Sequence, residues 1–225
     1  MAASKTKPTD RFALEKQWLD RGKSQVAGVD EAGRGPLAGP VVAAAVCLPP
    51  TWVRHGLPDE LEGLNDSKKL SAKKRECFFT FLSKCAEVDF GIADVDAQEI
   101  DRINILQATH KAMKLAIGKL SEPPDHLLVD GRSVKGLPVP QTAIVKGDSL
   151  SFSIAAASVL AKVTRDRMMV EYDNLFPGYG FAVHKGYGTR RHIEAISSLG
   201  PCPTHRRSFA PIKSLEPDLF FRTRP

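Results

Sequence analysis

Acidic residues stand at the ends of three short apolar segments of the chain. They are Asp30 with Glu31 after residues 26–29, Asp130 after residues 126–129, and Asp148 shortly after residues 142–145. Buried carboxylates are costly unless a cation compensates them. Ligands of open α/β sheets bind at strand ends, and carboxylate oxygens are ligands that Mg²⁺ and Mn²⁺ favour. Each acid alone would also fit an ordinary turn, but three such strand ends together predict a divalent metal site.

The pair Asp30 and Glu31 poses a geometric difficulty for this prediction. Neighbouring side chains on a regular strand point to opposite faces of the sheet. Both acids can serve one site if the backbone departs from the strand there. Gly33 and Gly35 follow closely, so we expect a bulge or tight bend at the acidic pair.

The glycine-rich turn after the acids allows a second interpretation, a dinucleotide-binding loop. Its glycines follow the pattern G-x-G-x-x-x-G rather than G-x-G-x-x-G, and Pro36 opposes an immediate helix. The preceding acids would also repel a pyrophosphate. A nicotinamide-dependent oxidoreductase is therefore disfavoured. The same glycines would let Arg34 and the backbone approach a phosphodiester closely.

Basic and aromatic residues supply candidate contacts to such a phosphodiester chain. Tyr187 stands between glycines in 186–188 and beside Lys185, a setting suited to stacking on a sugar or base. The basic candidates for phosphate contact include Lys68, Lys146, Lys162 and Arg165. His184, His192 and His205 raise the question of zinc, but their spacing fits no zinc-finger pattern, and structural histidines are expected.

The elements that must position these residues alternate between strand and helix patterns. Residues 26–30 and 40–48 predict an antiparallel strand pair, and residues 88–93, 126–129 and 142–145 predict further strands. Helical spacing of apolar residues covers 72–86, 101–120 and 153–175, the last with Lys162, Arg165 and Arg167 on its polar side. Residues 189–199 add a C-terminal helix. This order predicts one α/β domain whose C-terminal helices form a lobe.

Composition agrees with a basic, soluble enzyme or nucleic-acid-binding protein. The 225 residues carry a formal net charge of +6 and a pI near 9.2, which favours polyanionic partners. The four cysteines form no C-x-x-C pair, so reduced thiols are expected. Residues 1–24 form a polar extension with no apolar leader, and no apolar run is long enough to span a bilayer. We expect a cytoplasmic monomer that does not bind membranes.

The motifs closely resemble the bacterial type 2 ribonuclease H family, ribonuclease HII. The resemblance runs through 28–41 (GVDEAGRGPLAGPV), 65–71 (NDSKKLS), 129–131 (VDG), 145–149 (VKGDS), 156–166 (AASVLAKVTRD), 179–187 and the tail motif 205–209 (HRRSF). It covers nearly all of residues 25–213, which it identifies as the catalytic domain, between the extension 1–24 and a tail 214–225. Arg132 departs from the family, which often has Asn there.

The resemblance implies an RNase H-like mixed sheet flanked by helices, with a helical C-terminal extension. It also implies an endonuclease that cuts the RNA strand of RNA–DNA hybrids and cuts at ribonucleotides embedded in duplex DNA. Asp30, Glu31, Asp130 and Asp148 match its carboxylates, which would hold two Mn²⁺ or Mg²⁺ ions with substrate. The remaining matches are Gly33, Arg34 and Gly35 for sensing the 2′-hydroxyl, Tyr187 for stacking beyond the RNA–DNA junction, and Ser67, Lys68, Ser158, Lys162 and Arg165 for lining the substrate face.

The resemblance implies a two-metal hydrolysis that leaves 5′-phosphate and 3′-hydroxyl ends. The competing interpretation is a non-catalytic, basic nucleic-acid-binding module. Such a module explains the lysines and arginines, but not the four acids, which would weaken phosphate binding in the absence of a metal.

Overall fold

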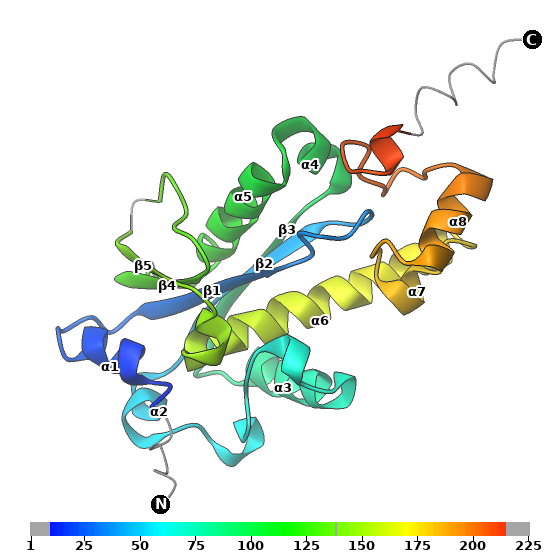
Figure 1. Cartoon of the computed structure of the whole chain (residues 1–225). Coiled ribbons are helices and arrows are strands. Elements are labelled where there is room, and N and C mark those ends of the chain that lie inside the picture. The colour runs from blue at the N-terminus through cyan, green and yellow to red at the C-terminus, as the bar shows by residue number, and fades with distance from the viewer. Residues whose placement is uncertain (1–9, 138, 215–225) are drawn as a thin grey trace, which may run out of the picture.

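A five-stranded mixed sheet forms the centre of the protein in a computed structural model, which describes residues 10–137 and 139–214 (Figure 1). The strand order is β3-β2-β1-β4-β5. β1 pairs antiparallel with β2 and parallel with β4; β2–β3 is antiparallel and β4–β5 parallel. The strand bounds are β1 Val26–Ala32, β2 Val41–Cys47, β3 Asp89–Val95, β4 His126–Asp130 and β5 Gln141–Ile144. The predicted antiparallel pair and the predicted α/β class are both confirmed.

Two long helices cover the two faces of this sheet, as Figure 1 shows. α6 (Phe152–Leu175) packs against one face together with α3 (Ala72–Lys84), and α5 (Ile105–Ile117) packs against the other. Gly28 allows the close approach of β1 to α6, because a Cβ there would lie 2.1 Å from the carbonyl carbon of Ser153. The remaining helices are α1 Ala13–Leu19, α2 Pro50–His55, α4 Ala97–Ile103, α7 Phe181–His184 and α8 Arg190–Leu199, with short 3₁₀ turns η1 Asp59–Leu61, η2 Ser67–Lys69 and η3 Gly147–Ser149.

The single helix predicted over 101–120 is wrong at its start. Asn104 has a φ of 67° and ends α4, and its side chain then accepts hydrogen bonds from the backbone N–H groups of Leu106 and Gln107 at the start of α5. Asparagine tolerates this left-handed conformation and caps helices well. The apolar spacing continues across the break, which is why periodicity alone predicted one helix.

The C-terminal lobe has a small core of its own. α7 and α8 lie at the far end of α6 (Figure 1) and pack around Phe181, Met169 and Ile196. Leu37 and Ala38, from the loop between β1 and β2, belong to the same core. The lobe is therefore attached directly to the glycine-rich segment that follows the acidic pair.

No helix in the described ranges is long and apolar enough to cross a membrane. The described part of the expected N-terminal extension is an integral part of the fold. Trp18 of α1 stacks on His126 of β4, with ring centroids 3.6 Å apart, and Glu15 is 2% exposed. The tail residues 215–225 and residues 1–9 lie outside the described residues.

Candidate active site

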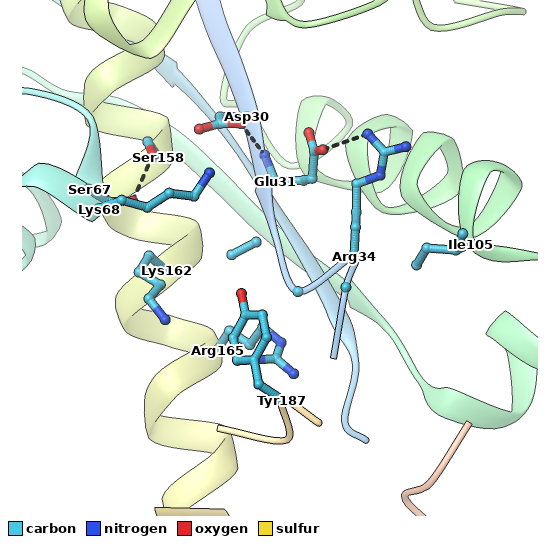
Figure 2. Close-up of a pocket in the computed structure, with 13 residues that line it drawn as sticks. Asp30, Glu31, Arg34, Ser67, Lys68, Ile105, Ser158, Lys162, Arg165 and Tyr187 are labelled. Carbon is cyan, nitrogen blue, oxygen red and sulfur yellow. Dashed lines mark hydrogen bonds and ion pairs between the residues drawn. The ribbon is translucent and has the colours of Figure 1, made fainter. Parts of the chain in front are cut away.

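The acidic pair stands at the end of a regular strand. β1 keeps its pairing with β2 through Asp30↔Ala44, Glu31↔Ala43 and Ala32↔Val42. The expected bulge at the pair is therefore wrong, and the left-handed turn comes only at Gly33, with a φ of 96°. The two carboxylates accordingly leave the strand on different sides, as Figure 2 shows.

Each of these carboxylates has neighbours on its own side. Asp30, 5% exposed, lies beside Ser158 of α6, and its Oδ1 accepts from the N–H of Glu31 at 2.7 Å. The Oε1 of Glu31 accepts from Nη1 of Arg34 at 3.1 Å. The pair therefore reaches a common strand end from two faces of the sheet.

Asp130 is the third acid, at the end of β4 beside the end of β1. β1 and β4 are parallel, with Val29 opposite Val129, so the next residue on each strand is an aspartate. The Oδ1 of Asp130 accepts from the N–H of Gly147 at 2.7 Å. This bond ties β4 to the turn that carries Asp148, and the predicted convergence of strand ends is present.

Electrostatics show that these acids are short of positive charge. Burial raises the pKa of Asp30 well above its ordinary value, and the charges of Glu31 and Asp130 raise it further. Burial also raises the pKa of Glu31, although Arg34 opposes this. The pKa of Asp148 is raised by burial and then by Asp66 and Asp130. Because each raised pKa reflects an unfavourable charged form, a bound cation would relieve all three.

Asp66 is an acid whose part in this cluster the sequence interpretation missed. It caps η2, where its side chain accepts from the N–H of Lys68 at 2.9 Å, and its charge lies near enough to Asp148 to raise the pKa of that acid. The sequence feature that could have pointed to Asp66 is its place in the 65–71 motif, directly before Ser67 and Lys68. A turn-forming Asp is the ordinary interpretation of that position, so spacing alone did not point to the site.

The donor set suits a hard divalent cation, but the carboxylates are not yet gathered around one point. Among the residues described, no three acid, histidine or cysteine side chains form a ready metal-binding group. Glu31 is turned toward Arg34, and Asp30 toward a backbone N–H. Rotation of these two side chains would free oxygens that are desolvated and mutually repelled.

A cavity of about 560 Å³ opens beside Asp30 and Glu31. Most of the predicted substrate-contacting residues line it: Gly33, Arg34, Gly35, Ser67, Lys68, Ser158, Lys162, Arg165 and Tyr187. Figure 2 shows Lys68 extending toward the acids and Tyr187 facing the same space from the other end. Asp130 lines an adjoining cavity of about 610 Å³ that shares Glu31 and Arg34. Lys146 is exposed, and neither it nor Asp148 lines either cavity.

Arg165 does not lie on the polar side of α6, as the sequence suggested, but is 1% exposed. Its Nε, Nη2 and Nη1 donate to the carbonyl oxygens of Pro40, Ala38 and Lys185, each at 2.9 Å. A side chain with these three partners positions the two loops that flank the cavity. Helical periodicity missed this because most neighbours of Arg165 on the second half of α6 are partly or fully exposed, and only the two loops cover Arg165 itself.

Arg206, from the tail motif 205–209, is a second buried arginine that contacts the glycine-rich turn. The sequence interpretation named it only as part of that motif. It is fully buried, and its guanidinium donates to the carbonyl oxygens of Gly33 at 2.5 Å, Arg34 at 3.0 Å and Gly39 at 3.0 Å. Together the two arginines satisfy carbonyl groups that no strand pairs with. The turn is thereby held rigidly in front of the acids.

Three buried histidines support the loop of Tyr187 from behind. Because a carbonyl oxygen only accepts, Nδ1–H of His192 donates to the carbonyl of Tyr187 at 2.9 Å. His205 Nε2–H then donates to His192 Nε2 at 3.1 Å, and the N–H of Cys202 donates to His205 Nδ1 at 2.9 Å. His184 stacks on His192 with centroids 4.4 Å apart. These are hydrogen-bonded structural histidines, as expected, and they orient the backbone of Tyr187.

This network predicts a dependence of stability on pH. Burial lowers the pKa of His192 and of His205 to about 4. The unfolded chain therefore binds more protons than the native state between about pH 4 and 6.5, and stability falls as the pH drops through that window, by about 1 kcal/mol per pH unit for each extra proton. Urea unfolding at several pH values measures this slope. His192→Asn keeps a donor for Tyr187 but cannot titrate, so its slope should be shallower; an unchanged slope would contradict the assignment.

Comparisons with known proteins find relatives along most of the chain. The family model described as Ribonuclease HII matches residues 27–212. Ribonuclease HII of Geobacter metallireducens is 62% identical over 188 residues, covering 84% of each chain, and that of Syntrophotalea carbinolica is 55% identical over 200 residues, covering 89% of this chain and 92% of the other. The crystal structure of ribonuclease H2 from Pyrococcus horikoshii superimposes with a TM-score of 0.70 at 27% identity, covering 89% of this chain and all of that one. The chain belongs to the ribonuclease HII family of metal-dependent hydrolases that cleave RNA in RNA–DNA hybrids.

Proposed function

We propose that this protein is an endoribonuclease that cuts the RNA strand of RNA–DNA hybrids and cuts duplex DNA at embedded ribonucleotides. The observation that carries the proposal is the shared cavity of about 560 Å³, in which Asp30 and Glu31 face the turn Gly33–Gly35 and the ring of Tyr187. A site that selects RNA must approach a 2′-hydroxyl and hold the scissile phosphate at once. Here the acids Asp30 and Glu31, which would face the phosphate, precede the turn Gly33–Gly35, which would face the 2′-hydroxyl, by a few positions in the chain.

Asp30, Glu31, Asp130 and Asp148 would hold the divalent ions, Mn²⁺ or Mg²⁺, two of them when substrate is present. The raised pKa values of three of these acids support this assignment, since buried carboxylates without a counterion are unstable in the charged form. When bound, such ions lower the pKa of an attacking water and stabilise the leaving 3′-oxygen, giving 5′-phosphate and 3′-hydroxyl ends.

The residues of the chain itself orient the substrate. Lys68 is exposed at the rim of the cavity, and its positive charge lowers the pKa of Glu31 and of Asp148. It is therefore placed to bind a phosphate oxygen beside the ions. Lys162 is held by Asp166 at 2.7 Å and lines the same cavity. Arg34 neutralises Glu31 in the absence of ions and becomes available to the nucleic acid once a cation takes its place.

The 2′-hydroxyl would be read at Gly33, Arg34 and Gly35. The carbonyl oxygens of Gly33 and Arg34 are occupied by Arg206, which fixes the turn before any substrate arrives. A Cβ added at Gly35 would lie 3.9 Å from Cε1 of Tyr187, its nearest neighbour. This opening beside an aromatic ring is where a ribose can approach the backbone.

Incubating the protein with a duplex that contains one ribonucleotide tests the proposal. We expect cleavage with Mn²⁺ or Mg²⁺ and none with a chelator, and products that carry 5′-phosphate and 3′-hydroxyl ends. An all-DNA duplex of the same sequence is the control. Binding of both duplexes without cleavage at any ion concentration would instead support the non-catalytic module.

Tyr187→Ala should reduce the preference for single embedded ribonucleotides over long hybrids by about tenfold. Stacking of a base on an aromatic ring contributes about 1–3 kcal/mol, and Tyr187 is 44% exposed and lines the cavity. The ratio of kcat/KM for the two substrates measures the effect, and Tyr187→Phe should retain most of the preference. Equal ratios in the wild type and Tyr187→Ala would remove the stacking role.

A further inference from the structure

The chain segment before β1 reaches the turn that carries Asp148. This segment lies outside the residues that the family model matches, 27–212. Nη2 of Arg11 donates to the carbonyl oxygen of Asp148 at 2.9 Å, and its Nη1 donates to the carbonyl oxygen of Leu64. One guanidinium therefore joins two segments that are 84 positions apart in the chain, residues 64 and 148.

Arg11 is itself held firmly against the start of α6. Its guanidinium carbon lies 4.3 Å from the ring centroid of Phe152, and the N–H of Phe152 donates to the carbonyl oxygen of Arg11 at 3.2 Å. One turn later, Oε1 of the buried Glu15 accepts from the hydroxyls of Ser151 at 2.6 Å and Ser153 at 2.8 Å. A carboxylate is favourable at a helix N-terminus. The segment is thus anchored before Arg11 makes its contacts.

The two segments that Arg11 joins are those whose side chains meet at the metal-ligand cluster. Leu64 precedes Asp66 by two residues, and the side chain of Asp66 lies close to that of Asp148. Nζ of Lys69 also reaches Oγ of Ser149 at 2.8 Å. These side-chain contacts join the η2 and η3 turns. Arg11 adds hydrogen bonds to a backbone carbonyl group on each side, at Leu64 and at Asp148.

We propose that Arg11 is a positioning residue for Asp148: by binding the backbones of η3 and of the segment before η2, it fixes where the Asp148 carboxylate meets a divalent ion. This inference rests on the proposed function, in which Asp148 is a metal ligand. Residues that hold a ligand in place typically change metal affinity or activity by about 10- to 100-fold when they are removed. The N-terminal segment thereby becomes part of the active-site scaffold.

Arg11→Met tests this inference, because methionine keeps the contact with Phe152 but donates no hydrogen bond. We expect the Mn²⁺ concentration for half-maximal cleavage to rise about tenfold, with the KM for the nucleic acid unchanged. Titration of the protein with Mn²⁺ alone in a calorimeter should show weaker binding by a similar factor. Arg11→Lys, which retains a donor, should restore part of the loss. Lys16→Met removes a positive charge from α1 at the exposed pair with Asp10 and should behave as the wild type.

A merely structural role would lower the thermal midpoint and leave the ion dependence unchanged below it, and that result would overturn the proposal. Combining Arg11→Met with Asp148→Asn adds a second check by calorimetry, since the effect of Arg11→Met on Mn²⁺ binding should vanish when Asp148 no longer binds an ion. An undiminished effect would show that Arg11 acts elsewhere. Failure of the proposed function is distinct, because the wild type itself would then not cleave.

Discussion

Asp130→Asn should abolish metal-dependent cleavage, by about 10³-fold or more, while making the ion-free protein more stable. Asparagine offers an oxygen to the N–H of Gly147, which Asp130 now contacts at 2.7 Å, so the turn before Asp148 keeps its hydrogen bond. The negative charge of Asp130 raises the pKa of Asp30, Glu31 and Asp148. Removing it relieves this repulsion.

The sign of the stability effect follows from linkage. A carboxyl whose pKa is raised in the folded state is destabilising once the pH exceeds its ordinary value, because the native form then resists ionisation. Lowering these pKa values should increase the free energy of unfolding at pH 7 in a chelating buffer by about 1–2 kcal/mol. Cleavage assays and urea unfolding with a chelator measure the two effects. Mn²⁺ should stabilise the wild type and leave Asp130→Asn nearly unchanged.

Asp59→Asn is the matched control for charge, because it removes an exposed carboxylate from η1, away from the cluster. It should alter neither activity nor the response to Mn²⁺. An Asp130→Asn protein that still cleaves at the wild-type rate would refute the metal-site assignment. A variant that is inactive but less stable than the wild type in the chelating buffer would show that the acids do not repel one another as described.

The sequence alone predicts the strands and the chemistry of their ends, because both depend on local patterns. Short apolar segments, each followed by an acid within a few residues, are enough to predict that Asp30, Asp130 and Asp148 lie near neighbouring strand ends. The break at Asn104 was missed because a polar residue with φ above zero leaves the apolar spacing unchanged. Local pattern cannot tell a capping Asn from an exposed one.

The residues that support the site were harder to predict, since their roles depend on contacts between distant segments. Arg165 has the spacing of a surface position on α6, yet three carbonyl groups of two loops surround it. Arg206 is in a tail motif that gave no hint of its contact with Gly33, 173 positions away. In the sequence alone, an arginine that will be buried against backbone carbonyl groups cannot be told from an exposed arginine that could bind phosphate. Only tertiary structure shows which of them bind the backbone instead.

Gly35→Ala should reduce kcat/KM for a ribonucleotide-containing duplex by about 100-fold and leave the protein folded. Its φ is not in the left-handed region, and the nearest atom to a new Cβ is 3.9 Å away, so the free protein has room for the methyl group. The obstruction arises only when a ribose approaches the backbone. A displacement of reacting groups by about 1 Å can cost about 10²-fold in rate, and activity assays beside thermal unfolding measure the two properties separately.

Gly33→Ala is the informative contrast, two residues away in the same turn. Gly33 has a φ of 96°, and a Cβ there would lie 2.1 Å from Nε of Arg165 and 2.7 Å from the carbonyl oxygen of Pro40. We expect this variant to lose about 3 kcal/mol or more of unfolding free energy through strain and overpacking. Gly118→Ala, at the end of α5 with an ordinary φ of −68°, should change neither activity nor stability appreciably. If Gly35→Ala kept full activity, the ribose would have to be recognised elsewhere, because the methyl group would stand in the opening assigned to it.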